Sequence, residues 1–361
     1  MVRSLFVYIN IFLAILLLLS GWSIYLNPTT FWLPALLGLG YPFLLVLNLA
    51  FIFIWLFLFK RKKAVFISLI SIMLTWSSFT SIFNISAAAR STGDVSLMTW
   101  NVKNFDLYNW SENEETHELM MQLLEQEKPD ILCIQEFYTE TKGKFKNIKE
   151  IKQRLGYKYY YFGETFSVKN GTKKWGLVTF SKFPIKDHGI ISFDSGARLN
   201  ACIFTDIEYK KDSLVRVYNT HLQSLHFADE DYKYLSEIKD DKKTDLESSK
   251  KILKKLKAGF EKRSTQAEKI KAHANSFEGK KIICGDFNDT PTSYTHQVLS
   301  EGLCDAFKEK GVGFGKTLVN PSPFFRIDFI LATPCIDVNS YETFSKKYSD
   351  HYPVKAFLEL N

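Results

Sequence analysis

The first 90 residues contain no acidic side chain and no cysteine. Their charged residues are all basic and contribute +6 of the formal net charge of +7: Arg3, Lys60, Arg61, Lys62, Lys63 and Arg90. Removing these six from the 46 bases leaves 40 against 39 acids, so the rest of the chain is nearly neutral. The basicity belongs to the N-terminal region and does not indicate a nucleic-acid substrate.

Cysteine motifs and a serine-nucleophile motif are also absent. All five cysteines lie after residue 90, in no Cys-x-x-Cys or Cys/His cluster, which argues against a structural zinc site. Their odd number, with Cys133, Cys202 and Cys284 in apolar runs, argues against a disulfide framework, although one pair involving Cys304 or Cys335 stays open. Without a Gly-x-Ser-x-Gly segment, a serine hydrolase is disfavoured.

Three long runs near the N-terminus lack any charged side chain: 4–26, 31–59 and 64–86. Each exceeds the roughly 20 residues that cross a bilayer. We predict transmembrane helices at about 4–26, 38–59 and 64–86, the second starting late because Pro34 and Pro42 interrupt its run. A cleaved signal peptide is the alternative for the first run, but no small-x-small site precedes Asn27.

The basic residues predict the orientation of these helices. Arg3 and the cluster at 60–63 are expected on the cytoplasmic side, and three spans then carry the rest of the chain across the membrane. The chain is therefore predicted to be an integral membrane protein with a cytoplasmic N-terminus, a membrane region at 1–90 and an extracytoplasmic domain at 91–361, either periplasmic or extracellular. The lipid bilayer is a partner, and no protein partner is inferred.

After residue 94, short β-rich runs alternate with a few helical stretches, which indicates an α+β domain of two packed sheets flanked by helices. Strands are predicted at 95–101, 130–136, 157–163, 174–181, 198–208, 214–221, 280–285, 326–332 and 352–359, and helices at 113–127, 145–155 and 228–275. The charged segment 229–271 has two interpretations: a basic arm for phosphates or the membrane surface, or a solvated helix packed on the domain.

Several of these strand-like runs carry a polar side chain at or near one end, where loops and water reach a sheet. Those side chains are Asn101, Glu136, His221, Asp286, Asn288, Asp328, Asp350 and His351. A set drawn only from Asn, Asp, Glu and His suits a hard divalent cation and a phosphate. Taken singly, each has an ordinary structural alternative, such as an Asx turn at Asp286.

Each of these residue types suggests a role. Glu136 is the best candidate ligand for Mg²⁺ or Mn²⁺, and Asn101 either binds the metal or hydrogen-bonds to a ligand carboxylate. Asp286 and Asn288, two apart on extended backbone, face the same side, so they can orient a water and contact a phosphoryl oxygen. Asp328 lies in an apolar run and needs a partner, for which His351 is the natural choice.

At these residues the chain resembles the endonuclease/exonuclease/phosphatase superfamily, which includes deoxyribonuclease I, abasic-site endonucleases, inositol polyphosphate 5-phosphatases and neutral sphingomyelinases. The resemblance covers about 96–360, through Trp-Asn101, Gln-Glu136, Asn-Thr-His221, Gly-Asp286-Phe-Asn288, Ile-Asp328 and Ser-Asp350-His351. It implies a four-layered αββα sandwich and metal-dependent phosphoester hydrolysis by water. Asn101, Glu136 and Asp350 would then serve the metal, Asp286 and Asn288 the water and phosphate, and His221 with Asp328 and His351 the transition state.

The resemblance leaves the substrate open. Three activities stay open: a nuclease or phosphodiesterase, a phosphoinositide phosphatase, and a sphingomyelinase-like enzyme. The loops that would select the substrate, at 102–117, 164–174 and 222–270, carry no sequence pattern that indicates one of them. The partner is accordingly a phosphoester, either nucleic acid or a phospholipid head group. The chain departs from the family pattern at the tyrosine that some nuclease members place beside the phosphate, for which it has no match, and the resemblance implies that Arg198 or Asn200 occupies that neighbourhood instead. A non-catalytic membrane-bound binding protein is the remaining alternative, although converging carboxylates without a cation are electrostatically costly.

Overall fold

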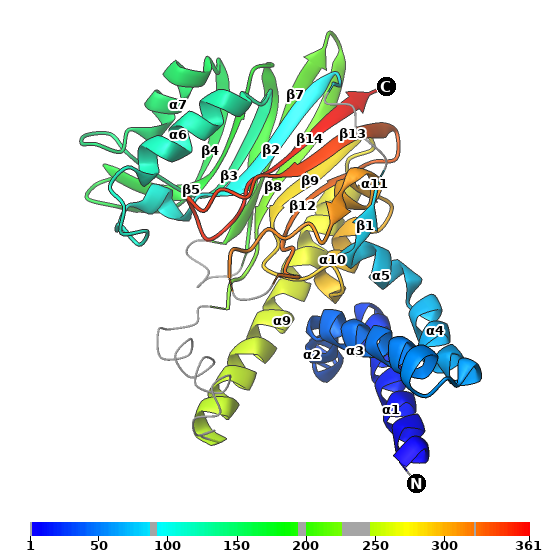
Figure 1. Cartoon of the computed structure of the whole chain (residues 1–361). Coiled ribbons are helices and arrows are strands. Elements are labelled where there is room, and N and C mark those ends of the chain that lie inside the picture. The colour runs from blue at the N-terminus through cyan, green and yellow to red at the C-terminus, as the bar shows by residue number, and fades with distance from the viewer. Residues whose placement is uncertain (1, 87–91, 194–199, 226–245, 321–322) are drawn as a thin grey trace. The chain divides into compact units, whose positions relative to one another are not determined.

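A computed structural model describes residues 2–86, 92–193, 200–225, 246–320 and 323–361 (Figure 1). The chain divides into two compact units. One unit holds 1–79, 223–267 and 292–298, and the other holds 80–222, 268–291 and 299–361. The predicted domain division at residue 90 stays a prediction.

The first unit is built on apolar helices: α1 (Val2–Trp22), α2 (Leu33–Leu39), α3 (Tyr41–Phe53), α4 (Val65–Leu74) and the start of α5 (Trp76–Ile82). By length and composition, Val2–Tyr25 and Tyr41–Leu58 can each cross a membrane. The third predicted span is bent by 76° between α4 and α5, where Thr75 ends the first helix, and it counts as one span only if the bent pair is taken together. The count of three is therefore approximate.

Hydrogen bonds between polar side chains join these apolar helices. Asn10 on α1 donates to the hydroxyl of Ser68 on α4 at 2.6 Å and accepts from the indole of Trp55 at 2.8 Å. Tyr41 on α3 lies 2.9 Å from the hydroxyl of Thr75. In an apolar environment, where helices gain little from burying more hydrocarbon, such bonds and close packing hold helices together.

The second unit contains two six-stranded sheets. The first has the order β13-β14-β2-β3-β5-β4, and the second has the order β10-β12-β9-β8-β7-β6. In each sheet the only parallel pair among the described strands is central: β2 with β3 in the first, and β8 with β9 in the second. The bounds are β1 (Asn84–Ile85), β2 (Val95–Asn101), β3 (Ile131–Glu140), β4 (Tyr159–Val168), β5 (Lys173–Ser181), β6 (Ile185–Ser192), β7 (Ala201–Lys210), β8 (Ser213–His221), β9 (Lys280–Asp286), β10 (Cys304–Asp305), β11 (Val312–Gly313), β12 (Asp328–Ala332), β13 (Ile336–Thr343) and β14 (Val354–Leu360).

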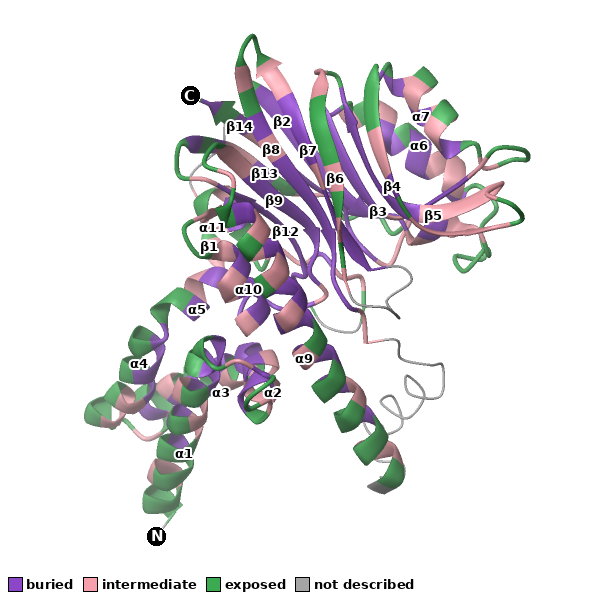
Figure 2. Cartoon of the chain, turned by 180° about the vertical axis from the view of Figure 1, so that it is seen from behind, coloured by how far each residue is buried: buried purple, intermediate pink, exposed green. Residues whose placement is uncertain are grey.

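Alternation along the strands produces two hydrophobic layers. Leu97 and Cys133 point into the core between the sheets with Val217 and Ile282, whereas their neighbours on the opposite face pack under helices. The outer helices of the first sheet are α6 (Thr116–Glu127) and α7 (Asn147–Leu155). The end of α9 (Leu246–Asn275) lies against the second sheet, where Tyr218 hydrogen-bonds to His273 at 3.0 Å. The central strands of both sheets are largely buried, whereas the edge strands β4 and β6 are mostly intermediate or exposed (Figure 2). With helices on its outer faces, this is the predicted αββα sandwich.

The predicted strands correspond to described strands, but some elements were missed. The edge strands β6, β10 and β13, the short strands β1 and β11, and the short helices α10 (Tyr294–Ser300) and α11 (Ala306–Lys310) were not predicted. The burial pattern of β6 has no fully buried residue, so its sequence lacks an apolar face. The helix predicted at 228–275 is described from Leu246 onward, and 226–245 lie outside the described residues.

Candidate functional site

The two central parallel pairs bring four predicted site residues to one edge of the sandwich: Asn101, Glu136, His221 and Asp286. Asn101 ends β2 and Gln135 pairs with it on β3, next to Glu136. His221 ends β8 and Asp286 ends β9, and these two residues are direct register partners. Because the carboxyl ends of neighbouring parallel strands lie at the same edge, sequence-distant residues converge there.

Two antiparallel strands supply the rest of the site from their starting ends. Asp328 is the first residue of β12 and pairs in register with Asp286 on β9. His351 precedes β14, which runs antiparallel to β2, and the indole of Trp100 donates to the backbone carbonyl of His351 at 3.0 Å. An antiparallel neighbour begins where the central strand ends, which places Asp328 and His351 beside the other four.

Local backbone geometry aims two of these side chains. Glu136 lies where the β3–β5 register shifts, and it has a positive φ of 46°. Such a bulge re-aims a side chain and is typical of strand ends near sites. Gly285 has φ 124°, and a β-carbon there would collide with the backbone of Thr220 on β8. Only glycine therefore allows β9 to approach β8 this closely just before Asp286.

The Asp286 carboxylate is the centre of the site. Its Oδ2 accepts from the amide of Asn101 at 3.0 Å and from that of Asn288 at 3.1 Å. The same oxygen lies 3.6 Å from Nε2 of His221 and 3.7 Å from Nε2 of His351. Asp286 is fully buried, and burial raises the pKa of its carboxyl, with the Asp328 charge acting in the same direction against His351 and His221.

Glu136 is more open to solvent than the other acids near Asp286. Its side chain is 25% exposed, and its Oε1 accepts from the amide of Asn101 at 3.1 Å and lies 3.6 Å from Nε2 of His221. The amide oxygen of Asn101 accepts from the backbone N–H of Lys103 at 3.1 Å. Asn101 and His221 thus bridge the two carboxylates of Glu136 and Asp286.

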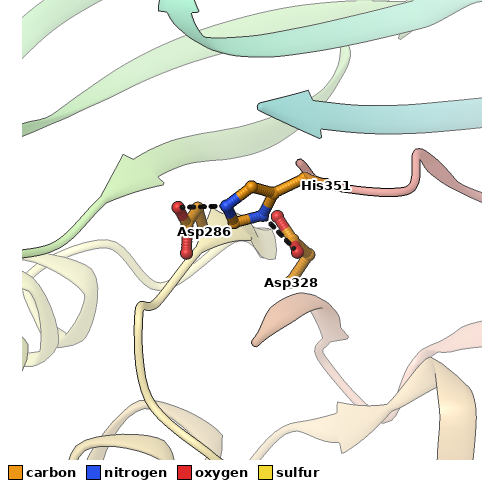
Figure 3. A group of neighbouring side chains, drawn as sticks. All are labelled: Asp286, Asp328 and His351. Atoms are coloured by element: carbon orange, nitrogen blue, oxygen red, sulfur yellow. Dashed lines mark hydrogen bonds and ion pairs between the residues drawn. The ribbon is translucent and has the colours of Figure 1, made fainter. Parts of the chain in front are cut away.

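Asp328 and His351 form a direct pair, drawn with Asp286 in Figure 3. Nδ1 of His351 lies 2.9 Å from Oδ2 of Asp328, and the other ring nitrogen faces Asp286. The Oδ1 atom of Asp328 is buried and has no hydrogen-bond partner among the described residues. Burial acts to lower the pKa of His351, but the carboxylates of Asp328 and Asp286 outweigh it and raise this pKa well above its usual value.

Asp350 lies apart from this group. Its carboxylate is ion-paired with Lys103 at 3.1 Å and accepts from the hydroxyl of Ser349 at 3.2 Å. No hydrogen bond or ion pair within the described part of the chain joins it to the other seven predicted side chains. Burial acts to raise the pKa of Asp350, but the charges of His351 and Lys103 lower it overall. The remaining seven form one connected set through contacts of 2.9 to 3.7 Å.

Several supporting residues were not predicted. Gln135 donates to Asn219 at 2.7 Å, and Asn219 donates to the backbone carbonyl of Val178 at 2.9 Å, so two buried amides link the sheets beneath the site. The hydroxyl of Thr317 accepts from the backbone N–H of Asp328 at 3.1 Å. Gln135 and Asn219 are polar residues inside apolar runs, and that pattern could have indicated that they form buried hydrogen bonds. Nothing in the sequence marks Thr317.

The two residues suggested for the tyrosine position differ in outcome. Asn200 is buried and donates to the backbone carbonyl of Leu222 at 2.8 Å, which also accepts from Asn288 at 3.0 Å. Asn200 therefore supports the loop that follows His221. Arg198 lies outside the described residues.

Residues 98–351 match the model of the endonuclease/exonuclease/phosphatase family, a span that contains the whole site. The chain belongs to this family. Its members are phosphoester hydrolases, both nucleases and phosphatases, and typically use divalent metals. Residues 3–82 match a second model, described as a domain of unknown function. No curated protein matches the chain in sequence.

Solved structures of the family share the fold. An endonuclease/exonuclease/phosphatase from Beutenbergia cavernae is 18% identical with a TM-score of 0.54, covering 73% of this chain and 71% of its own. One from Bacteroides vulgatus is 17% identical with a TM-score of 0.53, covering 74% and 99%. A mannosyl-6-phosphatase from Bacteroides thetaiotaomicron is 19% identical with a TM-score of 0.51, covering 73% and 99%. At these identities the similarity shows the fold alone.

Proposed function

We propose that the chain is a divalent-metal-dependent phosphoester hydrolase of the phosphodiesterase or nuclease type, tethered to a membrane. The observation that carries this proposal is the convergence of seven polar side chains from both sheets on the Asp286 carboxylate and its neighbours. Buried carboxylates gathered in this way are costly unless positive charge compensates them. A cation and a phosphoester whose transition state gains negative charge are the natural complements of this set.

The donor set fits a hard cation such as Mg²⁺ or Mn²⁺. Glu136 offers a carboxylate with a solvent-exposed edge, and Asn101 offers an amide beside it. Asp350, which is ion-paired with Lys103 two residues after Asn101, offers a second carboxylate. Asp286, Asp328 and His351 also lie close enough to hold an ion. However, the side chains of Asp286 and Asp328 are each only 1% exposed, whereas those of Glu136 and Asp350 are 25% and 44% exposed and open to an entering ion, which favours Glu136, Asn101 and Asp350 as the ligands.

The remaining side chains suit hydrolysis by water. Asp286 accepts hydrogen bonds and can orient or deprotonate a water, and the amide of Asn288 can donate to a phosphoryl oxygen. His221 and the Asp328–His351 pair would donate to the charge that develops on the phosphate. A bound Mg²⁺ would supply Lewis-acid stabilisation of the same charge.

Lipid head-group hydrolysis, by a phosphoinositide phosphatase or a sphingomyelinase-like enzyme, is the second candidate. The two helices that are long and apolar enough to cross a membrane favour it, because they would keep the enzyme beside lipid substrates. A non-catalytic binding role is disfavoured by the complete acid, amide and imidazole set. The basic residues Arg3 and Lys60 to Lys63 support a cytoplasmic N-terminus and an extracytoplasmic hydrolase.

Substituting Glu136 tests the proposal. Glu136→Gln in the full chain should lower Mg²⁺-dependent hydrolysis by about 10²-fold or more, since Lewis-acid stabilisation of several kcal/mol is lost. It should also weaken Mn²⁺ binding measured by electron paramagnetic resonance. The substrate panel should compare plasmid, oligonucleotides, phosphoinositides and sphingomyelin, each with Mg²⁺ and with EDTA.

Two comparison variants make the test specific. Glu208→Gln alters a half-buried acid paired with Lys186 near the opposite end of β7, and it should change neither activity nor Mn²⁺ binding. Asp328→Asn should reduce the rate but retain Mn²⁺ binding. If Asp328→Asn abolishes Mn²⁺ binding while Glu136→Gln spares it, the metal lies in the Asp286–Asp328–His351 group and the proposed ligand set is wrong.

A further inference from the structure

Two large aromatic side chains are exposed to solvent on the loop that links β2 to α6. Tyr108 and Trp110 are 62% and 47% exposed, and their ring centroids are 4.9 Å apart at an interplanar angle of 59°. Burying rings of this size would stabilise the fold, so a loop that exposes both forgoes that gain. Rigid aromatic side chains presented together in this manner are typical of ligand contacts.

The loop holds these rings in a defined place. Phe105 is fully buried and packs edge-on against Phe137, with centroids 5.4 Å apart. The Asp106 carboxylate accepts from both the backbone N–H and the hydroxyl of Ser111, closing the segment that carries the rings. Positive φ angles recur at Lys103, Asn104, Phe105, Asp106, Asn109 and Glu112. Such conformations cost energy in non-glycine residues and persist only where surrounding contacts enforce them.

Lys103 connects the aromatic pair to the candidate active site. Its Nζ lies 5.1 Å from the centroid of the Trp110 ring and 3.1 Å from the carboxylate of Asp350. Its backbone N–H donates to the amide oxygen of Asn101 at 3.1 Å. One residue thus contacts an exposed ring, a proposed metal ligand and the amide next to Glu136. A phosphate held at the site would lie near this ammonium group, and its substituent near Trp110.

We propose that Tyr108 and Trp110 form a stacking platform for the base of a nucleotidyl phosphodiester, with Lys103 contacting its phosphate. The inference rests on the proposed hydrolase function and names its substrate class. A flat base stacks on an indole or phenol ring, whereas an anionic phosphate attracts the adjacent ammonium, so ring and charge together match a nucleotide. A sugar phosphate has no flat aromatic face to stack on these rings. The choline cation of a lipid head group is attracted to aromatic rings, but the Lys103 ammonium beside Trp110 would repel it.

The test compares two oligomers that differ only in their bases. One is a short oligothymidylate, and the other is an oligomer of equal length whose sugars carry no base. In the full chain, Trp110→Ala should lower kcat/KM on the oligothymidylate by about 5- to 150-fold, mainly through KM, and leave the base-free oligomer unchanged. Trp110→Phe, which keeps a ring, should restore most of the loss. Tyr108→Ala should resemble Trp110→Ala but with a smaller effect.

Tyr160→Ala is the matched control. Tyr160 is also an exposed ring beside a lysine, 41% exposed and 5.0 Å from Nζ of Lys152, but it lies at the start of β4. This variant should alter neither substrate. Equal losses on both oligomers in Trp110→Ala, or no loss on either, would overturn the platform while leaving the hydrolase intact.

A binding measurement separates this inference from the proposed activity. Thymidine 5′-monophosphate should quench tryptophan fluorescence of the full chain, and the quenching should be lost in Trp110→Phe. Quenching without metal-dependent hydrolysis of any ester would retain the platform and reject the hydrolase. Absence of quenching together with base-independent hydrolysis would do the reverse.

Discussion

The Asp286 carboxylate receives contacts from four side chains that arrive from different places in the chain. Asn101 comes from β2, His221 from β8, Asn288 from the turn after β9, and His351 from the segment before β14. A fully buried acid with these neighbours is held by hydrogen bonds and by charge rather than by solvent. At this scale the site is a network, and single substitutions should not act independently.

Asp328 and His351 give the sharpest test of that dependence. His351→Ala should lower kcat by about 10² to 10⁴, the usual range for a positioned acid or base. Asp328→Asn should cost less, because the imidazole remains although it is poorly oriented. The double variant should lose much less than the sum of the two losses in log rate, since both remove the same 2.9 Å interaction.

The measurement is kcat for the wild type and the three variants, each checked for folding by circular dichroism. His188→Ala, an exposed histidine on β6, serves as the control. Additive losses would show that the two residues act separately.

Most residues of the candidate site could be predicted because each ends or starts an apolar strand. Polar side chains such as Glu136 and Asp286 stand out against runs like Ile131-Leu-Cys-Ile and Ile282-Ile-Cys. Lys103 and Thr317 could not be predicted, because they act through a turn and a loop whose shapes depend on distant contacts. Asp350 was grouped with the metal ligands from its motif, and its ion pair with Lys103 is visible only in three dimensions.

At the scale of elements, the parallel pair β8–β9 fixes the distance between His221 and Asp286. Gly285 allows the two strands to approach, because any β-carbon there meets the backbone of Thr220. The edge strand β6 escapes prediction from sequence because all of its residues are intermediate or exposed, so that it has no buried face. Central strands are specified by burial, whereas edges depend on pairing partners that are far away in sequence.

Gly285→Ala should therefore destabilise the fold by about 3 kcal/mol or more, from positive-φ strain and from strand separation together. Gly302→Ala isolates the first effect, because Gly302 also has a positive φ of 76° but nothing within 4 Å of an added β-carbon. It should cost only about 1 to 2 kcal/mol. The free energy of unfolding from denaturant titration checks both, and equal losses would contradict the strand-approach argument.

For the molecule as a whole, the proposed orientation is the feature that most constrains function. The basic cluster at 60–63 and Arg3 are expected to face the cytoplasm, so everything after the third apolar run would lie outside. Alkaline phosphatase fused after residue 90 should then be active, whereas a fusion within the basic cluster should be inactive. Fluorescence from green fluorescent protein, which folds poorly after export, at the C-terminus of the full chain would contradict this orientation.

The three cysteines buried between and beside the sheets would affect the lifetime of the protein in the extracytoplasmic compartment proposed for it. Cys133, Cys202 and Cys284 are free and have no exposed surface, and burial raises the pKa of the Cys202 thiol to about 12. In the native state their sulfur atoms are shielded from oxidants in solution. Each unfolding event exposes all three thiols. In an oxidising compartment they would then be oxidised, and the unfolded chain could no longer refold to the native state. The lifetime of the folded protein would then be set by its unfolding rate. A slow unfolding rate would matter more than a large free energy of unfolding.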